Sequence, residues 1–295
     1  MNTALFLALM LPGTFFLGLN DILIRKVLRS GKVNEQFLLA GNYLVSSVIF
    51  ALVTLIVGRP QIQSGFWSAL AVTVVLNTFA QWAWYAAFKK EEASLISPLR
   101  LLTPPLVIIT GFLILGEHTS LIGIFGILTT VLGLWILIRS ESKFQRISLT
   151  EIVKKPGVLL GFYGAVSFAI SFPFDKKIVV TSSALFALTL AFLAVGLINA
   201  MIFIFSNFRS REVFSSAGVS RPALLMIPLV QFCSAFLSYA ALNYSLAAYA
   251  ASVKRLWSLW AVILSGKFLG ERHIKEKLIA TLIMIVGILV TVFLG

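Results

Sequence analysis

Apolar segments of about 20 residues recur along the whole chain, and they restrict the fold more than any other feature. Runs such as Leu278 to Leu294 are apolar on every face. A helix that crosses a bilayer needs about 20 mostly apolar residues, whereas a strand of a membrane barrel alternates between apolar and polar residues. The pattern therefore predicts an all-α membrane protein.

Polar breaks divide the 295 residues into ten predicted transmembrane helices. They are expected near residues 4–26, 36–57, 66–88, 94–116, 119–138, 157–178, 183–206, 222–244, 248–269 and 275–294. Composition agrees, since 59% of residues are apolar, 12% are charged and the mean hydropathy is +0.98. The chain stays apolar from its start to about Leu19, which indicates a first span and not a cleaved signal. We expect a multi-pass protein of a cell membrane, inner or plasma.

The sequence contains an internal duplication. The longest polar connection separates a first five-helix repeat (1–140) from a second (157–295), with a connecting loop at 141–156. One offset of 154 residues aligns Asp21 with Asp175, Asn77 with Gln231, Tyr85 with Tyr239, Glu117 with Glu271 and Gly133 with Gly287. Because each half has an odd number of spans, the second half enters the membrane from the opposite face, which predicts two inverted repeats.

Each half also contains Leu-Gly-Glu at the end of a span, at Leu115–Glu117 and Leu269–Glu271, followed by a glycine-containing span. With this duplication the chain resembles the EamA-like transporters of the drug/metabolite transporter superfamily. The resemblance implies ten helices, of which spans 1–4 and 6–9 line a central cavity while spans 5 and 10 lie at the periphery. Members carry amino acids, sugars, nucleotide sugars and drugs, so the substrate does not follow from the fold.

Ionisable residues inside the spans are the main candidates for function, because each costs at least about 2.5 kcal/mol at a helix centre and needs a partner. Arg100 and its repeat mate Lys254, followed by Arg255, lie about six residues inside spans that enter from opposite faces, which predicts different depths. A hypothesis pairs Asp21 with Arg100, and Asp175 with Lys254 or Arg255, near the two mouths of the cavity. The alternatives are interfacial aspartates and snorkelling cations.

The residues Ser252–Arg255 resemble the ninth span of plastid phosphate translocators in the same superfamily, where a Lys-Arg pair holds the substrate phosphate. Most EamA-like relatives lack this pair. Fixed cations in a partly dry cavity favour an anion, with arginine offering a bidentate fork. The main prediction is a secondary transporter of a small polar metabolite, anionic or phosphorylated, working by alternating access. An exporter of amino acids or drug-like solutes is one alternative, and a channel or lipid scramblase is an alternative from another class.

Polar and aromatic residues of spans 3 and 8 form a second set of candidate substrate-binding residues. They are Asn77, Gln81, Trp82, Tyr85, Gln231, Tyr239 and Asn243. Spacings of three or four residues place the first four along one helix face, which suits hydrogen bonding and stacking around a polar solute. Interhelical hydrogen bonds and interfacial anchoring explain the same residues equally well. Three prolines, Pro98, Pro104 and Pro105, predict a break in span 4.

Other functional classes find little support in the sequence. His118 and His273 lie in loops without a ligand cluster, and no phosphate-binding P-loop is present, so we expect no enzyme, metal or cofactor. The expected driving force is an ion gradient, such as protons, or an exchanged solute. The net charge of +13 is spread between the spans, which disfavours nucleic acid and fits contact with an anionic bilayer. Most Lys and Arg lie opposite the N-terminus, which places the termini outside, whereas the resemblance implies cytoplasmic termini.

Overall fold

The computed structural model describes residues 2–29, 35–90, 97–141, 155–207, 221–257, 259–260, 263–264 and 274–295, and the elements in these ranges are helices. The first half contains α1 (Thr3–Arg29), α2 (Glu35–Val57), α3 (Phe66–Lys90), η1 (Ser97–Leu102), α5 (Thr103–Leu115) and α6 (Leu121–Glu141). The second half contains α8 (Pro156–Val180), α9 (Ala184–Asn207), α10 (Arg221–Ala241), η2 (Leu242–Tyr244), α11 (Ala247–Lys254), α13 (Ile274–Leu289) and the π-helical turn η3 (Val290–Leu294). These bounds follow the predicted spans to within a few residues, except that much of the ninth span after α11 lies outside the described residues.

Six of the described helices are long and apolar enough to cross a bilayer. They cover Thr3–Ile24, Gln36–Val57, Phe66–Trp84, Pro156–Val180, Ala184–Phe205 and Leu225–Tyr244. Three shorter apolar segments cover Leu99–Leu115, Leu121–Ile136 and Leu282–Leu294. Large apolar side chains such as Ile56, Leu121 and Phe205 are mostly exposed on the outside of the bundle, which is costly in water and natural in lipid. The chain is therefore a multi-pass membrane protein.

The fourth predicted span is divided, as its prolines predicted. A 3₁₀ segment, η1, ends at Leu102, and α5 begins at Thr103 with Pro104 and Pro105 in its first turn. Proline fits the first turn of a helix because the N–H groups there have no helical acceptor. At the other end, α5 stops at Gly116, whose φ of +68° favours glycine.

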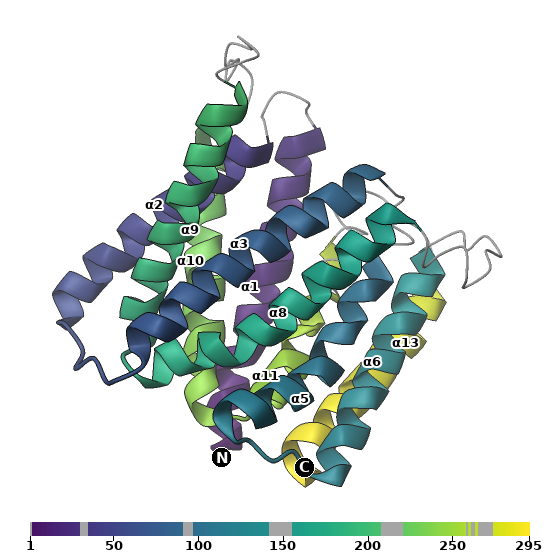
Figure 1. The fold of residues 1–295 in the computed structure, drawn as a ribbon. Coiled ribbons are helices and arrows are strands. Elements are labelled where there is room, and N and C mark those ends of the chain that lie inside the picture. The colour runs from purple at the N-terminus through teal and green to yellow at the C-terminus, as the bar shows by residue number, and fades with distance from the viewer. Residues whose placement is uncertain are drawn as a thin grey trace.

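Helices of one half pack mainly against helices of the other half. In Figure 1, α3 runs beside α8 and α6 runs beside α13, and the chain ends marked N and C lie at the same end of the bundle. Extensive contacts also join α1 to α10 and α2 to α9. Exchanging the halves converts the α3–α8 pair into the α10–α1 pair and maps the other two pairs onto themselves. The packing therefore has the pattern of a two-fold axis between the halves.

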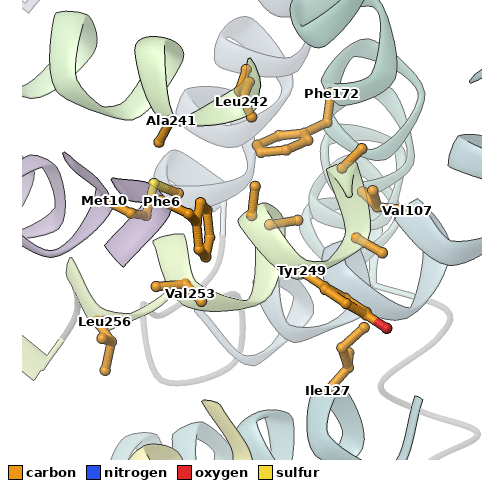
Figure 2. Packing of buried hydrophobic residues seen from close by; sticks show 14 of the residues in the cluster. Phe6, Met10, Val107, Ile127, Phe172, Ala241, Leu242, Tyr249, Val253 and Leu256 are labelled. Atoms are coloured by element: carbon orange, nitrogen blue, oxygen red, sulfur yellow. The ribbon is translucent and has the colours of Figure 1, made fainter. Parts of the chain in front are cut away.

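The largest apolar core surrounds α11. This short helix has the sequence AAYAASVK, and its first seven residues are all buried, since alanines on every face let neighbouring helices approach. Figure 2 shows Tyr249 and Val253 of α11 among Phe6 of α1, Val107 of α5 and other core side chains. The core thus fixes the position of Lys254, the last residue of α11.

Candidate functional site

Asp175 lies in the interior of the bundle, where several helices give it polar partners. It is only 5% exposed. Its Oδ1 accepts hydrogen bonds from Asn77 Nδ2 of α3 at 3.2 Å and from Ser171 Oγ of α8 at 3.4 Å. The Tyr239 hydroxyl of α10 donates to the same carboxylate. Neutral donors from three helices therefore hold this carboxylate, and the interfacial alternative does not describe it.

Pro173 lies inside α8, the helix that carries Asp175, and removes one of its backbone hydrogen bonds. Proline has no N–H, so the carbonyl of Ala169, four residues earlier, loses its helical donor. The hydroxyl of Thr110 in α5 donates to that carbonyl at 2.7 Å. A side chain of the first half thus satisfies the backbone group that proline leaves open in the second half.

Lys254 points into the same group of side chains. Its Nζ lies 5.4 Å from the centroid of the Phe172 ring and 5.7 Å from that of Tyr239, distances at which a cation is attracted to the ring face. Its charge acts on the Asp175 carboxylate. Asp175, Tyr239 and Lys254 therefore form one polar group, a geometry that fits the near-pair hypothesis and not a lysine that snorkels to the interface.

Arg100, in η1, places its guanidinium near two tryptophan rings. The Cζ atom lies 4.9 Å from the Trp84 ring centroid and 5.5 Å from that of Trp257, and Trp84 is only 3% exposed. Arg100 and Arg255 also repel each other electrostatically. The different depths expected for Arg100 and Lys254 stay a prediction. Because the ninth span enters from the opposite face, Trp257, about one turn beyond Lys254, lies nearer to Arg100 than Lys254 does along that span.

Span 3 contributes two amide side chains to the interior, whereas its residue Trp82 is exposed. Asn77 contacts the aspartate as described, and Gln81 Nε2 donates to the Tyr43 hydroxyl of α2 at 2.8 Å. Trp82 is instead 51% exposed, with its ring 5.6 Å from that of Phe79 on the outer face. At about 100° per residue, Gln81 lies about 40° around the helix from Asn77, whereas Trp82 lies about 140° away. The prediction that Trp82 shares the polar face was wrong.

A related contact joins α1 and α10, the pair of helices that corresponds to α8 and α3 when the halves are exchanged. Asn20 Nδ2 of α1 donates to Gln231 Oε1 of α10 at 2.6 Å. Gln231 is the repeat mate of Asn77, and Asn20 directly precedes Asp21, the repeat mate of Asp175. In both helix pairs, therefore, an amide side chain (Asn77 or Gln231) contacts the segment of the other helix that contains the repeated aspartate. The pairing of Asp21 with an arginine stays a prediction.

Of the two remaining predicted site residues, one lies apart from this group and the other has a side chain that the structure does not describe. Asn243 lies in η2, is exposed, and donates to the Ala240 carbonyl at 3.4 Å. Tyr85 belongs to α3, but its side chain lies outside the part of the structure that is described.

The fold and the repeated pattern agree with the comparisons to known proteins. The sequence model of the EamA-like transporter family matches this chain twice, over residues 4–139 and 155–293. The chain belongs to the EamA-like transporter family. It is a transporter of the drug/metabolite type by family, as its duplicated Leu-Gly-Glu pattern indicated.

A solved crystal structure has the same fold as this EamA-like chain, with a TM-score of 0.74. The two sequences are 15% identical over 98% of this chain and 99% of the other, so the likeness concerns the fold alone. No curated protein matches the sequence.

One ionic contact of this EamA-like transporter, between two largely buried side chains, was not predicted from the sequence. Glu117 forms a salt bridge with Lys176 of α8, and its Oε2 accepts the backbone N–H of Ala247 at 2.6 Å. Lys176 also donates to the Ser245 carbonyl. The signal was present in Leu-Gly-Glu: glycine ends α5 with a positive φ, and the backbone N–H of the next residue, Glu117, donates back to the Gly111 carbonyl of α5. Spacing could not show which helix the glutamate reaches.

Proposed function

We propose that this protein is a secondary transporter of a small anionic metabolite, which it moves across a cell membrane by alternating access between two inverted five-helix repeats. The ten spans predicted from the sequence and the two-fold packing pattern support this mechanism, because inverted repeats supply two near-equivalent conformations. The substrate-binding residues are Arg100, Lys254 and Arg255, with Asn77, Gln81, Gln231 and Tyr239 as polar neighbours.

The observation that carries the proposal is the convergence of three cations inside the bundle. Arg100 lies by Trp84 and Trp257, Arg255 acts on Arg100, and Lys254 faces the Asp175 group. Several cations gathered in a low-dielectric interior attract anions, and the planar guanidinium fork of arginine matches a carboxylate or a phosphate.

Transport by purified protein in liposomes tests the proposal. The panel contains phosphorylated metabolites, carboxylates, amino acids and sugars, and their transport is measured by uptake and by counterflow. We expect anions to be transported, and Arg100→Gln or Arg255→Gln to abolish transport. Arg100→Lys keeps the charge but loses the bidentate fork, so it should retain a fraction of the activity.

Arg59→Gln is the matched control, since this arginine lies exposed between α2 and α3. It should transport at the wild-type rate. Transport of anions that survives both interior arginine substitutions would contradict the proposed site.

A zwitterionic, amino-acid-like substrate is the second candidate, and the presence of Asp175 and Lys254 in one polar group favours it. A carboxylate and an ammonium in one site could bind the amino and carboxylate groups of an amino acid. The same panel separates the two candidates, because a zwitterion site would transport amino acids in preference to dianions.

A further inference from the structure

We propose that Asp175 is a proton-exchanging carboxyl group that couples anion binding at Lys254 to the uptake of one proton, so that the protein carries an anion together with a proton. This inference rests on the proposed function and names its coupling ion. It is carried by the placement of a buried carboxylate in the same group of side chains as a cation of the anion site, since Tyr239 neighbours both Asp175 and Lys254.

The first step of the argument is that Asp175 and an incoming anion compete for the same ammonium group. Lys254 faces Phe172 and Tyr239, and its charge acts on Asp175. While Asp175 is ionised, it neutralises Lys254 and repels an approaching anion. When Asp175 binds a proton, the cation is free to interact with the anion.

The second step is that the pocket around Asp175 accommodates both protonation states. The neutral donors Asn77, Ser171 and Tyr239 stabilise the ionised form. A protonated carboxyl group can instead donate, and the amide oxygen of Asn77 and the hydroxyl oxygens of Ser171 and Tyr239 are possible acceptors after rotation. Protonation therefore requires no large change in packing.

The charged and titratable groups near Asp175 leave Lys254 as its main ionic partner among the described residues. The neighbours are Tyr43 of α2, Thr73 and Asn77 of α3, Ser171 of α8, Tyr239 of α10 and Lys254 of α11. Lys176, next in sequence, forms its salt bridge with Glu117, and Lys177 lies against Gly65 in the α2–α3 connection. Arg255 acts on Lys254 and so raises the cost of leaving that ammonium without an anion.

The exchange is balanced without any other reactant. One Oδ atom of Asp175 takes a proton from water on the side where the anion enters, forming an O–H bond. The ammonium of Lys254 keeps its protons and exchanges the carboxylate for the anion. On the other side the anion leaves, Asp175 returns its proton to water, and the original pair forms again. By linkage, the proton and the anion each strengthen the binding of the other by the same factor.

Calorimetric titration of the full-length protein in detergent with inorganic sulfate tests this coupling. Each titration is repeated in buffers of different ionisation enthalpy, so that the heats report the number of protons taken up. It is run from about pH 5 to about pH 8, which covers the range of perturbed carboxyl groups. Wild-type protein should take up close to one proton per sulfate at the alkaline end, and its affinity should rise by up to about tenfold per pH unit as the pH falls.

Asp175→Asn should bind sulfate without proton uptake and with an affinity that no longer depends on pH. Asp175→Glu should restore proton uptake, which a merely structural role of the carboxyl group would not require. Arg59→Gln serves as the control and should behave as wild type.

The failures are distinguishable. Sulfate binding by wild-type protein without proton uptake, or equal uptake by Asp175→Asn, would overturn the coupling and leave the anion site intact. If wild-type protein and Arg255→Gln alike fail to bind sulfate, the anion site itself is overturned and the coupling with it.

Discussion

The side chain of Glu117, just after α5, accepts the backbone N–H of Ala247 at the start of α11 with a distance of 2.6 Å. The same carboxylate forms a salt bridge with Lys176 of α8. The first N–H groups of a helix have no helical acceptor and carry partial positive charge, so a carboxylate there is favourable. One glutamate of the first half therefore fixes the start of the helix that carries Lys254.

Substituting Glu117 should destabilise the protein more than an ordinary surface change does. Glu117→Gln leaves the largely buried Lys176 ammonium without its counter-charge and weakens the cap on α11. We expect a loss of about 1 to 3 kcal/mol in the free energy of unfolding. Thermal unfolding in detergent measures it, with Gln61→Ala in the exposed α2–α3 connection as the control. An unchanged melting temperature for Glu117→Gln would show that the contact contributes little.

Close packing between α6 and α13 makes a second prediction. A Cβ on Gly126 would lie 2.4 Å from Thr291 Oγ1, 2.6 Å from Thr291 N and 2.8 Å from Gly287 O. Two of these atoms belong to the backbone and cannot rotate away, so Gly126→Ala should cost about 1 to 3 kcal/mol. Gly41→Ala in α2 is the control, because nothing lies within 4 Å of its Cβ position. It should leave stability unchanged or raise it by up to about 1 kcal/mol, since alanine favours the helix. Equal melting temperatures for the two variants would contradict the close approach of α6 and α13.

Trp82 and Trp84, two of the three tryptophans of α3, should respond differently to the same substitution. Trp84 is buried against the Arg100 guanidinium, so Trp84→Leu should weaken sulfate binding about 3- to 30-fold through loss of the cation–ring contact. Trp82→Leu changes a side chain that faces outward, and it should alter stability and affinity by less than about 0.5 kcal/mol. Calorimetry and thermal unfolding measure both. A larger effect at Trp82 would return that residue to the site.

The Asn20–Gln231 hydrogen bond should appear as a coupling energy in a double-mutant cycle. Single and double alanine variants at the two positions should show an interaction of about 0.6 to 2 kcal/mol, the range of hydrogen bonds between membrane helices. Unfolding by a denaturing detergent provides the free energies. A cycle between Asn20 and the exposed Asn243 should be additive within about 0.5 kcal/mol. Additivity of the Asn20 and Gln231 changes would contradict the contact.

The helices and their order were predictable because the sequence pattern that specifies a membrane helix lies within the helix itself. Runs of apolar residues and the prolines of span 4 act within one segment, so they predicted the helix bounds to within a few residues and a break in span 4 without knowledge of the fold. The duplicated Leu-Gly-Glu pattern also indicated the family. Helix packing between the halves was less accessible, since it depends on which faces meet.

The candidate site was predictable only in part, because its contacts depend on which helices pack against each other. Asn77 and Asp175 were selected as separate polar residues in apolar spans, but their direct contact needs the pairing of α3 with α8. Trp82 was misplaced because a residue that lies three positions from Tyr85 and directly follows Gln81 still lies about 140° around the helix from Asn77. Tyr43 and Glu117 were missed because their partners come from other helices.

The packing of each half against the other also bears on how the protein is made. During synthesis, the first half enters the membrane before α8, α9, α10 and α13 exist, so the surfaces of α3, α2, α1 and α6 that they later cover must face lipid or one another. The apolar composition of these surfaces makes such an interval tolerable, whereas the side chain of Asn77 has no contact with Asp175 until α8 has been inserted. The two halves are thus in effect two subunits of an antiparallel dimer that a connection happens to join, and a chain cut within that connection should assemble into the same bundle when both pieces are present.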